Sequence, residues 1–361
     1  MLLMVEKEIK KTFADKKRII ILLIGLVVLT LQVLMAPASR LVNRAIEYDK
    51  KFYLETIDRV GGEYSEEKNK ELINISDDLE AESRAYGDLE IRDYFKGINI
   101  LDKMEEYSNR KYTSANRVTL NNIKMQMGYV KGDAKYRRLI YQNGWIELVE
   151  KSGVGVVSAI LSWMFGLIIL AGDYDSGMNN LTNTCLNGKK KHYYAKVCAV
   201  LTIVLLIHMI ELIARLIKIE MQYGIHDSES PVVSVSLFGY SPMNVSLLMM
   251  TIILYALKTI GLMFCVGLVA VIVAIVKNSV KVTFVFAGIL LFMKYIIPSK
   301  VLFMTGVGMY SGKEYIKGIP SVLGSEKVYF ANKTLWVIGI VNLLAFVIFC
   351  YVGGLLYAKK D

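Results

Sequence analysis

The chain has 361 residues, of which 54% are hydrophobic and only 5 are proline, and it carries a formal net charge of +10. Its apolar residues gather in long blocks, which excludes an ordinary soluble domain and predicts an all-α integral membrane protein, because each membrane-spanning helix needs about 20 apolar residues. The basic excess favours membrane topology and attraction to anionic lipid over nucleic-acid binding, since no basic patch interleaved with stacking aromatics is present.

An amphipathic entry helix is predicted for residues 1–18. Leu2, Val5, Ile9 and Phe13 recur at helical spacing, with lysine and glutamate between them. We expect this helix to lie on the cytoplasmic leaflet before the chain turns into the membrane. The alternative is a solvated leader.

Six apolar blocks predict six transmembrane helices. They are Ile19–Met35, Val154–Ala171, Val197–Ile213, Leu247–Val276, Val282–Ile297 and Leu335–Tyr357. With this count the amino-terminal, carboxy-terminal and two connecting segments on one face hold 14 basic residues against six acidic ones, so both termini are expected in the cytoplasm of a multi-pass cell-membrane protein. The first helix, 19–36, has a signal-peptidase-like end at Ala36-Pro37-Ala38, but its long lead favours a retained anchor over a cleaved signal peptide.

Residues 37–152 predict a mostly helical extracytoplasmic domain between the first two membrane helices. The segment is almost neutral, with 20 Lys and Arg against 21 Asp and Glu, and has no apolar run of membrane length. Apolar residues recur at spacings of three and four, which is typical of helices. It contains neither His nor Cys, so no metal centre is expected there.

Residues 153–361 predict a five-helix membrane region that contains a cytoplasmic segment at 173–196. In the first of these helices, Ser158, Ser162 and Gly166 form a stripe of small residues at which another helix could approach closely. The alternative is that these small residues occur there by chance on a lipid-facing helix.

The stretch 299–334 is too broken to be a span and too apolar to be a free loop. We expect a pair of short helices that dip into the outer leaflet and are covered by protein.

Ionisable residues within the predicted spans are candidates for a translocation path, because charge is costly in lipid. His208, Glu211 and Arg215 share one face of the third span, and Lys258 lies in the fourth. One hypothesis is a polar lining in which Glu211 meets Lys258. The alternative is that Glu211 pairs with Arg215 at i,i+4, while Lys258 and Lys294 extend toward the interface.

The cytoplasmic segment, "DYDSGMNNLTNTCLNGKKKHYYAK", is acidic at its head and basic at its tail, as expected for a helix complemented at both ends. It resembles the coupling-helix region of type-2 ABC transporter permeases, and the lead "VEKEIKKTFADKKRIIILL" resembles the entry helix of that family. The matching residues are Asp173, Asp175, Ser176, Gly177, Leu181, Thr184, Lys189, Lys190 and Lys196. The chain departs from the family pattern where Asp replaces Glu, Met178 replaces Thr, Leu186 and Asn187 replace a proline-containing pair, and Lys replaces Arg.

The resemblance implies a permease subunit of an ABC exporter, in the subfamily with a large domain between the first two spans. It also implies a second permease chain, identical or related, and a separate ATP-binding subunit that receives the matching residues and holds ATP and magnesium. The chain itself lacks a Gly-x4-Gly-Lys-Ser/Thr phosphate loop, so no cofactor and no enzymatic activity are expected in it.

The expected cargo is a peptide or an amphipathic compound, because a large outer domain and apolar outer loops suit a bulky substrate. The alternative function is a membrane-anchored sensor or interaction protein that binds an extracellular ligand through residues 37–152. An intramembrane enzyme is not favoured, since no span shows paired carboxylates, a His-x3-His metal pair or a Ser-His constellation.

Overall fold

The computed structural model describes residues 2–37, 50–93, 100–152, 155–175, 188–310, 312–320, 327–328 and 332–358. The chain forms two compact units. Unit 1 comprises Met1–Ala36, Lys151–Lys218 and Thr251–Asp361, and unit 2 comprises Pro37–Glu150 and Ile219–Met250.

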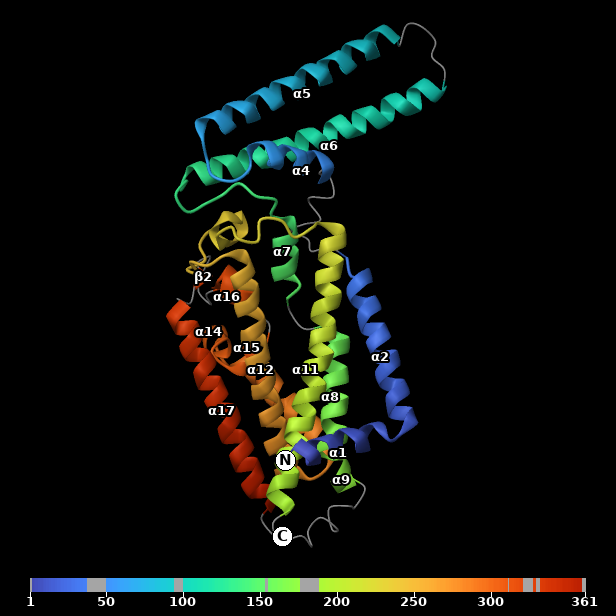
Figure 1. Ribbon diagram of the computed structural model, residues 1–361, viewed down its shortest axis with the longest axis vertical. Coiled ribbons are helices and arrows are strands. Elements are labelled where there is room, and N and C mark those ends of the chain that lie inside the picture. Colours follow the sequence, from blue (N-terminus) through green and yellow to red (C-terminus); the bar gives the residue numbers. More distant parts are fainter. Residues whose placement is uncertain are drawn as a thin grey trace. The chain divides into compact units, whose positions relative to one another are not determined.

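Unit 1 is built almost entirely of helices. Its longer elements are α1 (Leu2–Phe13), α2 (Lys16–Met35), α8 (Val156–Leu170), most of α11 (Gly188–Gln222) and of α12 (Leu247–Val276), α13 (Ser279–Ile296) and α17 (Asn332–Ala358). Its shorter elements are α9 (Gly172–Asp175), α14 (Ser299–Leu302), α15 (Gly306–Met309), α16 (Glu314–Lys317) and the paired strands β1 (Ile319–Pro320) and β2 (Lys327–Val328). The axes of α2, α8, α11, α12 and α17 are roughly aligned, and α1 crosses near one end of them (Figure 1).

Among the described residues, five helices are long and apolar enough to cross a membrane: α2, α11, α12, α13 and α17. The chain is therefore an all-α multi-pass membrane protein. The remaining predicted span, Val154–Ala171, corresponds to α8, which has 15 residues. At 1.5 Å per residue it extends roughly 22 Å, less than the hydrocarbon core of about 30 Å, so a sixth span stays a prediction.

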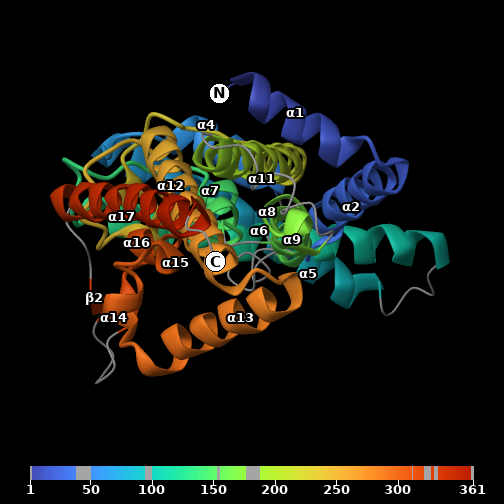
Figure 2. The same ribbon diagram turned by 90° about the horizontal axis from the view of Figure 1, so that it is seen from below.

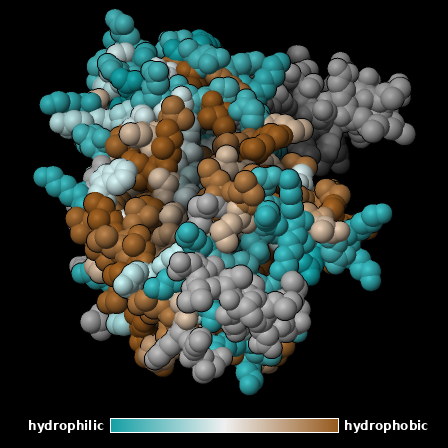
Figure 3. Space-filling view, turned by 60° about the horizontal axis from the view of Figure 1, so that its bottom comes forward, coloured by the Kyte–Doolittle hydropathy of each residue, from teal (hydrophilic) through white to brown (hydrophobic). Residues whose placement is uncertain are grey.

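The core of unit 1 lies around α11 and α12. Half of the most apolar stretch of each of these helices is buried, against 11% for α2 and α13. Buried side chains such as Phe165, Val200, Ile203 and Val273 fill the space between them. The outer helices instead expose apolar side chains widely, as the brown surface in Figure 3 shows. This arrangement suits a bundle surrounded by lipid.

Local sequence explains where the helices of unit 1 turn. Asp15 lies in the short break between α1 and α2. Its side chain caps α2 by accepting a 2.9 Å hydrogen bond from the Lys17 amide. Between α12 and α13, Lys277 adopts a left-handed φ of 55° and Asn278 caps α13 by accepting from the Lys281 amide at 3.0 Å. Figure 2 shows α13 at the edge of the unit, with α14 near one of its ends.

In the broken stretch 299–334, the described residues form three short helices, α14, α15 and α16, where a pair was expected. Gly306, Gly308 and Met309 are buried in it, so protein does cover part of this backbone. Its depth in a membrane stays a prediction.

Unit 2 is also helical. It contains α4 (Lys50–Val60), α5 (Glu66–Asp93), α6 (Ile100–Lys131), α7 (Asn143–Glu150) and the short 3-10 turns η1 (Val232–Ser234) and η2 (Ser236–Phe238). Helices α5 and α6 run antiparallel (Figure 1). Tyr53, Val60, Leu72, Ile123 and Val130 belong to its own core.

The segment Ile219–Met250 packs onto the remainder of unit 2, which the sequence did not predict. The Tyr129 hydroxyl donates to the Val233 carbonyl at 2.6 Å, and the Trp145 indole donates to the His226 carbonyl at 2.8 Å. Unit 2 is thus larger than the predicted domain 37–152, because a second connection between membrane helices completes it.

Candidate functional site

Two buried polar clusters lie within unit 1. The Glu211 cluster comprises Gly155, Ser162, His208, Glu211, Arg215 and Tyr310. The Asp173 cluster comprises Glu8, Lys11, Asp173, His192 and Lys196. Ionisable groups are rare among apolar helices and, by default, mark function, so these two clusters are the candidate functional sites.

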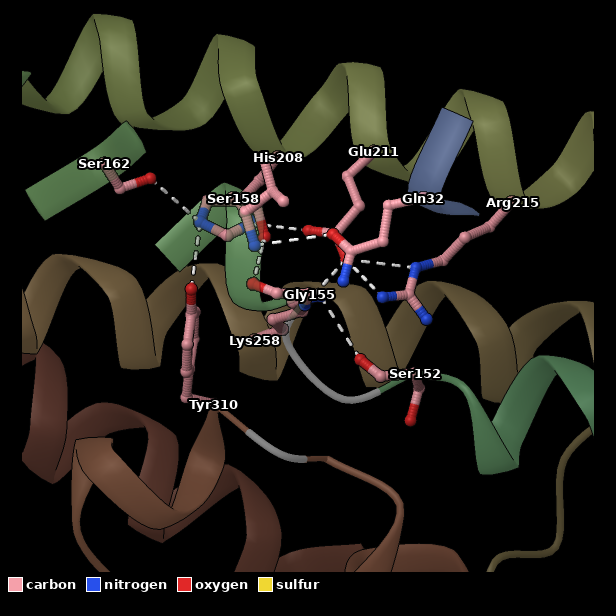
Figure 4. A network of polar contacts seen from close by, with 11 residues as sticks. Gln32, Ser152, Gly155, Ser158, Ser162, His208, Glu211, Arg215, Lys258 and Tyr310 are labelled. Carbon is pink, nitrogen blue, oxygen red and sulfur yellow. Dashed lines mark hydrogen bonds and ion pairs between the residues drawn. The ribbon is translucent and has the colours of Figure 1, made fainter. Parts of the chain in front are cut away.

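The Glu211 side chain is only 1% exposed, and its carboxylate accepts hydrogen bonds from several neighbours (Figure 4). Arg215, one helical turn further along α11, donates through Nε at 3.1 Å and also contacts Glu211 through Nη2. The amide of Gly155, which caps α8, donates to Glu211 Oε1 at 3.0 Å. Since a helix amino terminus favours negative charge, Glu211 joins α11 to the start of α8.

His208 connects this carboxylate to the opposite side of the cluster. Its Nδ1 lies 3.2 Å from Glu211 Oε2, and a carboxylate only accepts hydrogen bonds, so Nδ1 carries a proton. In a neutral imidazole Nε2 is then the acceptor, and it faces the Tyr310 hydroxyl at 3.0 Å and the Ser162 hydroxyl at 3.4 Å. A chain of polar contacts therefore runs from Arg215 to Tyr310 (Figure 4).

Lys258 lies beside this cluster but does not join it as expected. Within the described part of the chain, its ammonium donates to the Ser152 carbonyl at 3.2 Å and not to Glu211. Glu211 and Lys258 are therefore close enough to attract each other but do not form the expected direct pair, because Arg215 and His208 occupy the carboxylate. The alternative was half right: the i,i+4 pair forms and Lys294 is exposed, but Lys258 is buried at 6% exposure and does not extend outward.

The stripe of small residues on α8 faces α11. Ser162 reaches His208, and a β-carbon added at Gly166 would lie 3.8 Å from Val200. Ser158 is fully buried and its hydroxyl donates to the Gly155 carbonyl at 2.8 Å. The stripe thus contacts α11 through Ser162 and Gly166, but the helix that packs most closely on α8 is α2.

An apolar cavity of about 480 Å³ opens next to the Glu211 cluster, between α8, α11, α12, α13 and the α15 region. Ser162 and Tyr310 line it and are also the two residues that contact His208 Nε2. Trp163 and Phe286 stack at 4.7 Å on its wall. The polar cluster thus ends at the boundary of an apolar space large enough for a small-molecule ligand.

In the Asp173 cluster, one carboxylate gathers three basic groups. Lys11 of α1 and Lys196 of α11 each place Nζ 2.6 Å from Asp173, and His192 Nε2 lies 3.0 Å away. Burial opposes ionisation of Asp173, but the hydrogen bond from His192 and the charges of Lys196 and Lys11 outweigh it and hold the pKa of this carboxyl far below its ordinary value. Asp173 is therefore ionised at neutral pH.

The local sequence explains why these groups meet. His192 and Lys196 lie four residues apart on α11, and Glu8 and Lys11 lie three apart on α1, so each pair shares one helix face. His192 Nδ1 also lies 3.6 Å from a Glu8 carboxylate oxygen. Asp173 consequently connects α9 to both helices.

The predicted coupling residues do not share one environment. Asp173 and Lys196 are buried at 4% and 1% exposure and pair with each other, so in this structure they do not present a docking surface. Asp175 and Lys190 are exposed, and Lys189 is half-buried. Ser176, Gly177, Leu181 and Thr184 lie outside the described residues.

No protein-family model matches this chain, and neither the curated proteins nor the solved structures searched contain a match. The interpretation of both clusters thus depends on their own geometry. Among the described residues, no group of three or more His, Cys, Asp or Glu side chains is arranged to hold a metal ion.

Sequence reasoning missed Tyr310, His192, Glu8 and Lys11 as members of the clusters. Tyr310 lies in the broken stretch that no helical period places, so nothing in the sequence relates it to His208. His192 offered a usable signal, because a single histidine follows three lysines at the entrance of an apolar helix.

Proposed function

We propose that this chain is the membrane subunit of an ATP-driven exporter in the cell membrane. The cytoplasmic segment 173–196 would rest against a separate ATP-binding subunit that holds ATP and magnesium, and a second permease chain would complete the translocation path. The resemblance of this segment to the coupling region of type-2 ABC permeases motivates the proposal.

The observation that carries the proposal is the position of Asp173 in a buried ion cluster. It lies in α9, directly before the segment that would contact the partner, and it is bonded to α1 and α11. Charged hydrogen bonds are stronger when water is excluded. A force applied to the segment would therefore move α9 together with these two helices.

This geometry revises the roles within the predicted coupling set. Asp173 and Lys196 would transmit movement inside the chain, since their side chains are buried. The exposed Asp175, Lys190 and Lys191 would form the docking surface. Asp175 also accepts a 3.3 Å hydrogen bond from the Ser279 amide, which gives the docking surface a direct connection to α13.

The translocation path would pass the Glu211 cluster and the adjoining cavity. Two-state packing changes are the usual means by which ATP-driven closure of one subunit alters another. The Gly155 amide, at the start of α8, donates a hydrogen bond to Glu211 of α11. Movement of α11 would therefore displace the start of α8.

Co-purification tests the proposal. The tagged chain is extracted from its native membrane in mild detergent beside a docking variant, Asp175→Asn with Lys190→Gln and Lys191→Gln. A control variant, Lys7→Gln with Lys10→Gln, removes exposed charge from α1 instead. An ATP-binding protein retained by the native chain and the control but lost from the docking variant supports the proposal. Absence of any ATPase from the folded native chain rejects it.

A second function is favoured by the separate core of unit 2. Tyr53, Leu72 and Ile123 belong to a buried cluster that lies wholly within this unit, so it has the form of an independent domain. If no ATPase accompanies the chain, we propose instead a membrane-anchored sensor or interaction protein that binds an extracellular ligand through this unit. Such a protein would change its contacts without ATP turnover.

A further inference from the structure

Lys258 is a buried cation that makes no direct ion pair within the described part of the chain. No described carboxylate lies within 4.0 Å of its ammonium, and a backbone carbonyl, that of Ser152, is its hydrogen-bond acceptor. The acidic group that attracts it is Glu211, which also pairs with Arg215, so two cations share one negative charge. An ammonium with 6% exposure in an apolar bundle is costly unless an anion neutralises it.

Lys258 does not line the apolar cavity but lies one helical turn from its wall along α12. Lys258, Leu262 and Cys265 lie at i, i+4 and i+7 and so share one face of α12. Leu262 and Cys265 line the cavity. Tyr310 borders both sites, since it lines the cavity and its ring centroid lies 5.9 Å from the Lys258 ammonium. A ligand extending along this face of α12 would meet first hydrocarbon and then positive charge.

The cavity itself suits a hydrocarbon chain. Its walls include Val200, Val204, Leu262 and the stacked pair Trp163 and Phe286. Its volume of about 480 Å³ falls in the range typical of small-molecule sites. A small anion would leave this space unfilled, and a neutral apolar molecule would leave Lys258 and Arg215 to share the single negative charge of Glu211.

We propose that unit 1 binds an anionic amphiphile, with its hydrocarbon chain in this cavity and its carboxylate or phosphate head paired with Lys258. The molecule is either a membrane lipid or a compound that the protein handles, since both present the same chemistry. The inference does not depend on an ATP-binding partner.

Trp163 provides a reporter for this site, because it lines the cavity. The full chain with Trp145→Phe and Trp336→Phe keeps Trp163 as its one tryptophan among the three of the sequence. It is reconstituted in phosphatidylcholine nanodiscs and titrated with dibromostearic acid, whose bromine atoms quench tryptophan fluorescence, or with the neutral dibromostearyl alcohol. We expect saturable quenching by the acid at lower concentration than by the alcohol.

Two substitutions distinguish binding of the charged head from binding of the hydrocarbon chain. Lys258→Met should weaken binding of the acid about 30-fold or more and leave binding of the alcohol almost unchanged, since a buried charge pair loses one partner. Ala287→Phe should abolish saturable quenching by both probes, because Ala287 lines the cavity. Lys294→Met, which removes an exposed lysine from α13, is the matched control and should change neither titration.

Equal quenching by acid and alcohol, unaffected by Lys258→Met, would overturn the proposal, as would quenching that survives Ala287→Phe. Because the two variants act through different properties, a folding failure of one leaves the other decisive. Nanodiscs containing phosphatidylglycerol then identify the source. Loss of the acid titration there assigns the site to membrane phospholipid, and its persistence assigns it to a compound other than the bilayer lipid.

Discussion

Asp173 and Lys196 form an ion pair of 2.6 Å in which the two side chains are 5% and 1% exposed. The pair connects the short helix α9 to the core helix α11, and Lys11 approaches the same carboxylate from α1. Because both charges have left water, removing one leaves the other without compensation. Such a pair behaves quite differently from the many ion pairs on a protein surface.

Asp173→Asn should therefore destabilise unit 1 strongly, by about 3–5 kcal/mol, since the buried Lys196 loses its counter-charge. The measurement is the melting temperature of the purified chain in detergent, followed by size-exclusion chromatography after heating. Lys196→Met in the same chain should recover part of the loss, because it removes the orphaned cation. Glu6→Gln is the control: it breaks the exposed pair between Lys10 and Glu6, and no change is expected. Equal melting temperatures for Asp173→Asn and Glu6→Gln would contradict this role.

The stability that Asp173 contributes should depend on pH in a defined direction. The folded-state pKa of this carboxyl lies far below the unfolded value of about 3.9, so its contribution is complete above that value and is lost as pH falls below it. The difference in melting temperature between the native chain and Asp173→Asn should consequently be present at about pH 5 and above and shrink as the pH falls toward about 3. A difference that grows below about pH 5 would show that the charge is not stabilising.

Gly261 should be intolerant of even one methyl group. A β-carbon there would lie 2.6 Å from the Gly306 carbonyl oxygen and 3.0 Å from the Tyr310 amide nitrogen, both of them backbone atoms. Gly261→Ala should push α15 away from α12, displace Tyr310 and cost about 1–3 kcal/mol. In Gly339→Ala the nearest atom, Ile260 Cδ1, is at an ordinary 3.5 Å. That control should be neutral or slightly stabilising in the same melting experiment, because alanine favours helix.

Tyr129→Phe tests the connection between α6 and the segment Ile219–Met250 in unit 2. The tyrosine hydroxyl donates to the Val233 carbonyl at 2.6 Å, so its removal should cost about 0.5–1.5 kcal/mol. Amide hydrogen exchange should accelerate around residues 232–238. Tyr136→Phe alters an exposed tyrosine of the same unit and should leave exchange there unchanged. Equal amide protection of residues 232–238 in Tyr129→Phe and Tyr136→Phe would mean that this hydrogen bond does not hold the segment.

Periodicity predicted the long elements of this chain because helix formation among apolar residues is a local property. The α2, α12 and α13 helices lie close to the predicted blocks. It also placed His208, Glu211 and Arg215 on one face of α11.

Contacts between distant segments were not accessible from periodicity. Nothing in the helical period pairs Glu211 with the backbone of Gly155, since this contact depends on how α8 enters the bundle. Likewise Tyr310 and Ile219–Met250 come from irregular stretches, whose positions are set by the surfaces against which they pack.

Glu211→Gln separates a structural role of the Glu211 cluster from a functional one. The substitution keeps a side-chain oxygen for the Gly155 amide but removes the charge that faces Arg215, so a loss of about 3–5 kcal/mol is expected. Glu220→Gln, at an exposed position on the same helix, keeps an oxygen that can accept the 2.9 Å hydrogen bond from the Ile225 amide, so it is the control and should not change the melting temperature. Adding Arg215→Met should restore much of the stability, because the unpaired guanidinium is then gone. If the doubly substituted chain melts like the native chain and still moves cargo, the cluster serves only stability. If it is stable and inactive, the charge itself belongs to the path.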